Sequence, residues 1–187
     1  MADTREKILD VAEELIRSVG VNAMSYKHIS EAVGIRKASI HHHFPKKDDL
    51  VDELLNRCQT SYGAHYASII EGDDPAPDQL RNLARIFEDG LVTNKLCVVG
   101  SISTDRNTLT DRTCELLENN ISSTVRIFSK VFAKGEKEGT LVFSGSADDA
   151  AYTFLSFLIG TQIVARAQGG KEFFNKAAKL MIEALSR

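Results

Sequence analysis

Residues 25–44 read SYKHISEAVGIRKASIHHHF, and this stretch decides the fold. Ser25 is a good N-cap because its hydroxyl can accept a hydrogen bond from the free N–H groups of a following helix. We therefore expect a short helix over 26–33 with its apolar side chains facing inward. Gly34 follows the last apolar residue and suits the tight turn that ends such a helix.

A second short helix is expected over 36–44. Ile40 and Phe44 lie four residues apart and share its buried side, and Pro45 prevents the helix from continuing. Two short helices joined by a tight turn are the parts of a helix-turn-helix, in which the second helix lies in the major groove of DNA. The outward face of that helix must then be small, polar or basic. The residues that meet this requirement are Arg36, Lys37, Ser39 and His42.

Charge is distributed unevenly along the chain, whose net charge is −3. Residues 17–47 hold six Lys or Arg, four histidines and a single acid, whereas residues 48–187 carry a net charge of −5. A basic segment on an otherwise acidic chain is the pattern expected of a nucleic-acid-binding region. Charge alone also fits a solvated basic face, or a helical adaptor that binds an acidic protein.

The rest of the chain is predicted to be helical, since it has three prolines and no sustained alternation of apolar and polar residues beyond 140–143. The fold class is therefore all-α, with about nine helices. We divide the chain into a helix-turn-helix domain over 1–46 and a larger helical domain over 47–187. Further helices are expected at roughly 4–19, 47–70, 78–93, 97–104, 111–137, 147–168 and 171–185.

Two local signals mark helix ends. Gly20 follows the last apolar turn of the first helix, where a left-handed cap is wanted. Ser146, with Asp149 three residues later, resembles a capping pair at the start of the penultimate helix.

Composition excludes several classes of protein. No apolar run reaches the ~18 residues of a membrane span, the polar N-terminus does not look like a signal peptide, and three scattered cysteines do not suggest a disulfide framework. We therefore expect a cytoplasmic protein without a membrane partner. Common catalytic motifs do not occur, so we expect no enzyme and no cofactor. Three successive histidines, at 41–43, point about 100° apart on a helix and cannot share one metal ion.

Four segments match one family pattern together: TREKILDVA at 4–12, SYKHISEAVGI at 25–35, SIHHHFPKK at 39–47, and Leu50. In these residues the chain resembles the TetR-type repressors, over about 4–54. The resemblance implies a homodimer that binds a palindromic operator in double-stranded DNA. The residues that fall on the family's DNA-contacting positions are Tyr26, Lys27, Lys37, His41, His42 and Lys47.

The chain departs from the family pattern at three positions. Arg36 stands where the family usually has a Ser or Thr cap on the recognition helix, so the cap is weaker and a cation is gained. His41 replaces the usual Tyr, and Lys46 replaces a common Ser cap. We expect these differences to influence which operator is bound. The equivalent of His43 usually packs internally, so a structural role is expected for it.

The last two helices are expected to form the dimer interface. The penultimate helix is apolar nearly all round and the last has a broad apolar face, so both need partners. The resemblance implies a four-helix interface between two copies, and the alternative is that both helices serve only the core of one chain. The predicted interface residues are Phe154, Phe157, Leu158, Phe173, Phe174, Leu180 and Met181.

The resemblance also implies a small-molecule effector site among the middle helices, whose occupation releases the DNA. We expect its residues to have polar tips on apolar helices, or to supply apolar walls. The candidates are Tyr62, His65, Tyr66, Phe87, Leu91, Cys97, Phe128, Tyr152 and Gln162. Core packing is the alternative for each of them.

Cys97 suggests an alternative function. It lies near the start of a short helix and two residues after Lys95, and both features lower the pKa of a thiol. An oxidant- or electrophile-sensing repressor that acts through Cys97 is therefore the second hypothesis. A buried cysteine that serves as a small apolar residue is the competing interpretation.

Overall fold

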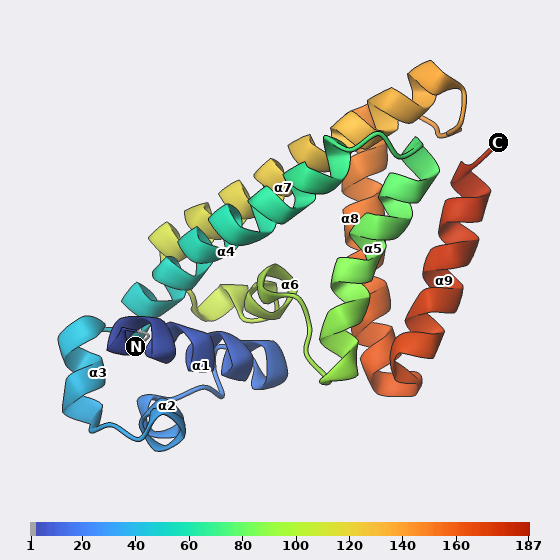
Figure 1. Ribbon diagram of the computed structural model, residues 1–187. Coiled ribbons are helices and arrows are strands. Elements are labelled where there is room, and N and C mark those ends of the chain that lie inside the picture. Colours follow the sequence, from blue (N-terminus) through green and yellow to red (C-terminus); the bar gives the residue numbers. More distant parts are fainter. Residues whose placement is uncertain (1–2) are drawn as a thin grey trace. The chain divides into compact units, whose positions relative to one another are not determined.

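The computed structural model describes residues 3–187, and within them the chain forms nine α-helices and one 3₁₀ helix, as the sequence predicted for an all-α fold (Figure 1). The helices are α1 (Thr4–Val19), α2 (Tyr26–Val33), α3 (Lys37–His43), α4 (Lys47–Ile70), α5 (Ala76–Val92), α6 (Val98–Ser103), α7 (Asp111–Glu138), α8 (Ala147–Gln168) and α9 (Gly170–Leu185), and the 3₁₀ helix η1 spans Arg106–Thr108.

Three helix ends are formed by the residues that the sequence predicted. The Ser25 hydroxyl accepts from the His28 N–H, Gly34 ends α2 in the left-handed conformation, and Ser146 and Asp149 form a reciprocal capping box on α8. Gly20 differs, because its φ of 88° is combined with a ψ of 168°, which is outside the left-handed helical region.

Two further details differ from the sequence prediction. Helix α5 begins two residues earlier than expected, at Ala76, with Pro75 as its N-cap residue and Pro77 in its first turn, where the missing N–H costs no intrahelical bond. The segment 140–143 forms no strand, and pairs only through an isolated bridge between Leu141 and Ser186.

The chain separates into two compact units that differ from the predicted division at residue 46. The first unit contains the residues up to 59 together with 97–120, and the second contains 60–96 and 121–187. Helices α4 and α7 therefore each contribute their first part to one unit and their second part to the other.

The core of the first unit is built on α1, which packs against α2 and α6. Ile8, Leu9, Ala12 and Ile16 form one fully buried stripe on α1. Each buried aliphatic side chain of the size of Leu or Ile contributes about 1.5–3 kcal/mol, so this stripe accounts for much of the unit's cohesion.

Polar contacts fix the start of α4 and of α7 within the first unit. Arg57 of α4 binds Asp10 and Glu13 of α1, with both N···O distances at 2.6 Å. The buried Asp52 accepts a hydrogen bond from the Thr113 hydroxyl at 2.6 Å and pairs with Arg112 at 3.0 Å. These contacts hold the first half of α4 against two other helices of the unit.

The second unit has α5, α8 and α9 packed on one another (Figure 1). Its core is strongly aromatic, since Phe128, Phe132, Phe154 and Phe174 are fully buried. The rings of Phe132 and Phe154 meet edge to face with their centroids 5.9 Å apart. Edge-to-face pairs of this kind add to the energy of apolar burial.

By length and composition alone, helix α8 is long and apolar enough to cross a membrane. The sequence had not suggested a segment of this kind. In the tested window 44% of it is buried inside the protein. A core helix of a soluble protein can have the same length and composition. Helix α8 has apolar residues on two sides: one side lies in the core of the second unit, and the other is exposed and is described below.

Candidate nucleic-acid interface

The turn between α2 and α3 is held by hydrogen bonds of the turn itself. The N–H groups of Gly34 and Ile35 both donate to the Ser30 carbonyl, and the Ser30 hydroxyl donates to the Ile35 carbonyl at 2.7 Å. Since Gly34 has a φ of 75°, a residue with a β-carbon would be strained there. The two helices are thus held in a fixed relation.

Helix α3 presents a small, polar and basic face to solvent. Lys37, Ala38, Ser39 and His42 are exposed, while Ile40 on the opposite side is fully buried. Arg36 is the N-cap residue and is exposed, and its side chain makes no capping hydrogen bond, as the sequence predicted. The face has the size and charge that a major-groove reader needs.

The hydroxyl of Tyr26 makes its hydrogen bonds inside the protein. Its hydroxyl lies 2.8 Å from the Phe44 carbonyl and 2.7 Å from the Lys46 carbonyl, and it can donate its single proton to either. Burial, together with the nearby Asp49 and Asp48, raises the pKa of Tyr26 to about 12. The hydroxyl therefore joins the end of α3 to the start of α4, a role that the sequence analysis did not assign to it.

His41 also makes contacts within the protein. Its Nδ1 lies 3.3 Å from the Pro45 carbonyl, which can only accept, so Nδ1 is the protonated nitrogen of that contact. The His41 ring meets the Tyr26 ring edge to face at 4.8 Å between centroids. His43, for which a structural role was expected, is half-buried, and its ring lies against that of His42.

The remaining cations lie at helix starts. Lys27 in the first turn of α2 is exposed and lies 3.9 Å from Glu31. Lys47 begins α4 and is half-buried, and burial lowers its pKa against the opposing effects of Asp105 and Asp48. The Lys46 N–H donates to the Asp49 carboxylate at 2.9 Å, which is the half of a capping box that needs no Ser or Thr at position 46. An acid three residues after the cap position was the sequence signal for this contact.

Comparison with known proteins places this arrangement in a family. The model of the bacterial regulatory proteins of the tetR family matches residues 8–54. The solved structure of a TetR-family transcriptional regulator from Agrobacterium tumefaciens is 30% identical, with a TM-score of 0.91 over 98% of this chain and 97% of that chain. The chain belongs to the TetR family.

Two curated relatives agree with this assignment. The HTH-type transcriptional repressor KstR2 of Rhodococcus jostii is 33% identical over 66 residues, which are 35% of this chain and 32% of that protein. The HTH-type transcriptional regulator TtgR of Pseudomonas putida is 23% identical over 164 residues, 84% of this chain and 78% of that protein. The first match thus spans about a third of its relative. As a TetR-family member, the chain is a DNA-binding transcription regulator and not an enzyme.

The predicted effector-site residues of this TetR-family chain fall in different places. Tyr66, Phe87, Leu91 and Phe128 are buried in the second unit, where the rings of Tyr66 and Phe128 lie 5.2 Å apart. The buried Gln162 donates to the Phe87 carbonyl at 2.6 Å. Tyr62 is half-buried with its ring 6.3 Å from that of Tyr66, whereas His65 and Tyr152 are exposed. Of the predicted residues, Tyr62, Tyr66 and Phe128 therefore form one cluster of ring contacts.

Cys97 behaves differently from the sequence expectation. It lies in the first unit and caps α6, where its sulfur accepts from the Gly100 N–H at 3.2 Å. Burial nevertheless raises the pKa of the thiol to about 11, because desolvation of the thiolate outweighs that contact and the charge of Arg17. The expectation of a lowered pKa was wrong. Cys58 is affected in the same direction, to about 12.

The predicted dimer residues divide into buried and exposed groups. Phe154, Leu158 and Phe174 lie in the core of the chain itself, so their side chains are not presented to a partner. Phe173 and Leu180 are exposed, and Phe157 and Met181 are half-buried. The exposed face of α8 was not predicted from the sequence. Its members are Tyr152, Thr153, Ser156, Gly160, Ile163, Val164 and Ala167.

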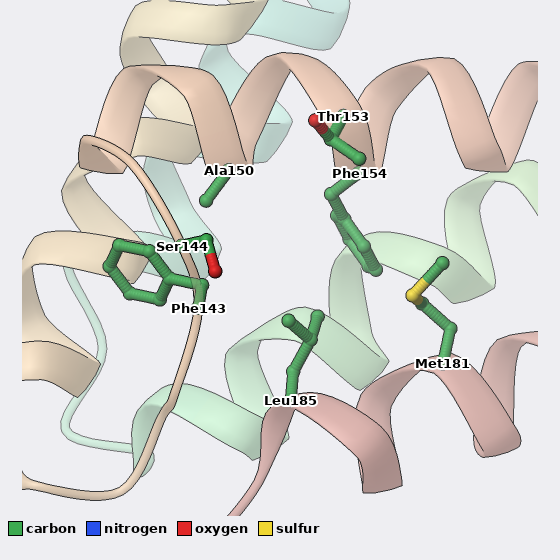
Figure 2. Close-up of a pocket in the computed structure, with 7 residues that line it drawn as sticks. All are labelled: Phe143, Ser144, Ala150, Thr153, Phe154, Met181 and Leu185. Carbon is green, nitrogen blue, oxygen red and sulfur yellow. The ribbon is translucent and has the colours of Figure 1, made fainter.

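An apolar hollow of about 290 Å³ lies between the start of α8, the end of α9 and the segment before α8 (Figure 2). Phe143, Phe154, Met181 and Leu185 supply most of its lining, and Ala150, Thr153 and Ser144 complete it. Thr153 belongs both to this hollow and to the exposed face of α8. The hollow is thus continuous with that face.

Proposed function

We propose that the protein is a homodimeric repressor that binds a palindromic DNA operator in the cytoplasm and is released from it by a small molecule. The observation that carries the proposal is α3, whose exposed face combines Lys37, Ser39 and His42 with Arg36 at its start. Repression, rather than activation, is supported by the similarity to a protein named as a repressor.

Two kinds of contact with DNA are proposed: contacts to base edges and contacts to phosphates. Lys37, Ser39 and His42 read base edges from the exposed face of α3, and Arg36 does so from the N-cap position just before it. Phosphate contacts come from residues at the helix starts and at the end of α3, and they fix the protein on the duplex without reading sequence. The phosphate-contacting residues are Lys27, His41 and Lys47, with the ring of Tyr26 beside them.

The test is selection of binding sites from a pool of random duplexes with the purified chain. The expected product is an inverted repeat whose half-sites are about one helical turn, ~34–36 Å, apart. Enrichment of no sequence, or of single half-sites only, contradicts the proposal. A variant with Lys37→Ala should select a different half-site, whereas Lys130→Ala, at an exposed position of α7 in the second unit, should select the same one.

Dimerisation is proposed through the exposed faces of α8 and α9. The exposed face of α8 is uncharged over four turns, and Phe173 and Leu180 extend it on α9. Gly160 lies at its centre, where an added β-carbon would meet nothing within 4 Å in the chain itself. A glycine at this position lets a second helix approach closely. Light scattering should give twice the 20.6 kDa of one chain, and a mass of one chain would contradict the proposal.

The effector is proposed to bind in the second unit, next to the aromatic cluster of Tyr62, Tyr66 and Phe128. Such a lining favours a largely apolar molecule with few polar groups. A thermal-shift screen of apolar and aromatic compounds tests this, since a ligand present at 100 times its Kd stabilises the folded state by about 2.7 kcal/mol. Compounds that raise the unfolding temperature should also lower operator affinity. If stabilising compounds leave DNA binding unchanged, the proposed release is wrong.

A further inference from the structure

A carboxylate far along the chain holds the loop that leads into the helix-turn-helix. Asp105, just after α6, accepts two hydrogen bonds from Asn22, one from its backbone N–H at 3.1 Å and one from its side-chain Nδ2 at 2.8 Å. The Thr108 hydroxyl lies 2.9 Å from Asn22 Oδ1 and 2.8 Å from the Asp105 backbone carbonyl, and it can donate its single proton to either. Two hydrogen bonds, with this third contact beside them, thus join a single loop residue to a segment more than 80 residues away in sequence, within the same compact unit.

Gly20 gives independent evidence that the two segments are fitted to each other. Its φ is 88°, and a β-carbon built on it would lie 2.9 Å from Asp105 Oδ2. A residue larger than glycine would therefore be strained in its backbone and would also displace the carboxylate. The loop can approach Asp105 this closely only with glycine at this position.

The loop that Asp105 holds carries the start of α2. Asn22 is three residues before Ser25, the N-cap of α2, and Tyr26 and Lys27 follow directly. Asp105 also acts electrostatically on Lys47, the first residue of α4. One side chain therefore influences two of the helix starts at which phosphate contacts are proposed.

We propose that Asp105 is a positioning residue of the DNA-binding unit: through Asn22 it fixes the loop before α2, and so the placement of Tyr26 and Lys27, without touching DNA itself. This inference rests on the proposed DNA-binding surface. A carboxylate near that surface repels phosphate, so its hydrogen bonds must favour operator binding by more than its charge opposes it.

The charge and the hydrogen bonds of Asp105 can be separated by substitution. In Asp105→Asn the charge is lost, but the hydrogen bonds can be kept if the Asn22 amide turns over. Asn22 Oδ1 then accepts from the new amide, and Asn22 Nδ2 donates to the Thr108 hydroxyl, which is free to donate to the Asp105 backbone carbonyl 2.8 Å away. In Asp105→Ala both the charge and the bonds are lost.

The experiment measures the Kd of the full chain for a duplex selected from the random pool and for a scrambled duplex, at matched salt. Asp105→Ala should weaken binding to the selected duplex about fivefold, the effect of ~1 kcal/mol. Its binding to scrambled DNA should be unchanged or tighter, because a negative charge has been removed. Asn22→Ala should show a smaller loss of the same kind, and Asp105→Asn should restore binding to the selected duplex.

The control is Asp111→Ala, which removes an exposed acid from the first turn of α7. It should leave the ratio between the two duplexes unchanged. Circular dichroism melts identify variants that are unfolded at the assay temperature. Two results would overturn the inference: equal losses on both duplexes for Asp105→Ala, or binding by Asp105→Asn as weak as by Asp105→Ala. If the wild-type chain does not prefer its selected duplex, the proposed function itself has failed instead.

Discussion

Replacement of Tyr26 by Phe separates two roles for this residue. The family resemblance assigns Tyr26 to DNA contact, whereas the structure engages its hydroxyl with the Phe44 and Lys46 carbonyls at 2.8 and 2.7 Å. The substitution removes one oxygen and leaves the ring beside His41. If the hydroxyl acts inside the protein, Tyr26→Phe lowers the free energy of unfolding and weakens DNA binding only as a consequence.

The magnitude follows from the hydrogen bonds. One hydroxyl proton makes one full bond at a time, worth about 1 kcal/mol, and the part-buried Phe44 carbonyl also loses its partner, so we expect a loss of ~1–2 kcal/mol. For a chain of this size, each 1 kcal/mol lowers the unfolding temperature by about 2–4 °C. Denaturant unfolding at pH 7, followed by circular dichroism, measures the difference directly.

Alkaline pH gives a second measurement of the same contact. The pKa of Tyr26 is raised from 10.0 to about 12 in the folded chain, so the folded state retains the proton after the unfolded chain has lost it. The stabilisation by the neutral hydroxyl is complete below pH 10 and is lost as the pH rises from 10 to 12. The stability difference between wild type and Tyr26→Phe should therefore shrink over that interval.

The opposite result would refute this reasoning. If Tyr26→Phe unfolds at the same denaturant concentration as the wild type and yet binds the operator more weakly, the hydroxyl contacts phosphate and its internal bonds contribute little. Lys130→Ala is the control, because Lys130 is exposed on α7 and lies outside the proposed DNA, effector and dimer surfaces. It should change neither stability nor DNA affinity.

Three further predictions concern the DNA face, the dimer face and the thiols. Lys47→Ala should weaken binding to every duplex and reduce the salt slope by about one, whereas Lys37→Ala should also change base preference by ~1–3 kcal/mol; equal effects of both on selected and scrambled DNA would contradict the placement of Lys37 in the groove. Gly160→Leu should convert the dimer to a monomer in light scattering. Gly63→Leu, at a helical glycine that is also without close neighbours, should leave the dimer intact. A dimeric Gly160→Leu protein would contradict the proposed close approach of the partner helix at Gly160. With a pKa of about 11, Cys97 should resist alkylation at neutral pH in the folded chain, and peroxide should not release the protein from its operator. If peroxide releases the wild type but not Cys97→Ser, the oxidant-sensing hypothesis is restored.

Signals local in sequence predicted most of the fold. Ser25 and Ser146 were identified as N-caps and Gly34 as a turn because the residues that satisfy them lie within a few positions along the chain. The composition of the helices was enough to predict an all-α protein. The face of α3 followed from Ile40 and Phe44, which fix the buried side and so leave the opposite side for DNA.

Contacts between distant segments could not be predicted in this way. Nothing near Asn22 indicates that Asp105 binds it, because the signal lies in the three-dimensional approach of two loops. The error at Cys97 has a similar origin: its neighbours in sequence favour the thiolate, but the packing around it removes water and disfavours the charge more strongly.

The uniform composition of α8 explains the division among the predicted dimer residues. Because the helix is apolar nearly all round, its sequence does not show which side is buried in its own chain. Phe154 and Leu158 lie in the core, whereas Ile163 and Val164 are exposed. Large side chains were selected from the pattern, but the available face also depends on the small residues Ser156 and Gly160.

The central claim is sequence-selective DNA binding by two copies of this chain through α3. Its most direct test is a fluorescence anisotropy titration of the selected duplex and of a scrambled duplex with the wild-type protein, at one physiological salt concentration. The account predicts a stoichiometry of two chains per selected duplex and an affinity about 10³-fold or more above that for the scrambled one. Equal affinity for the two duplexes would contradict it.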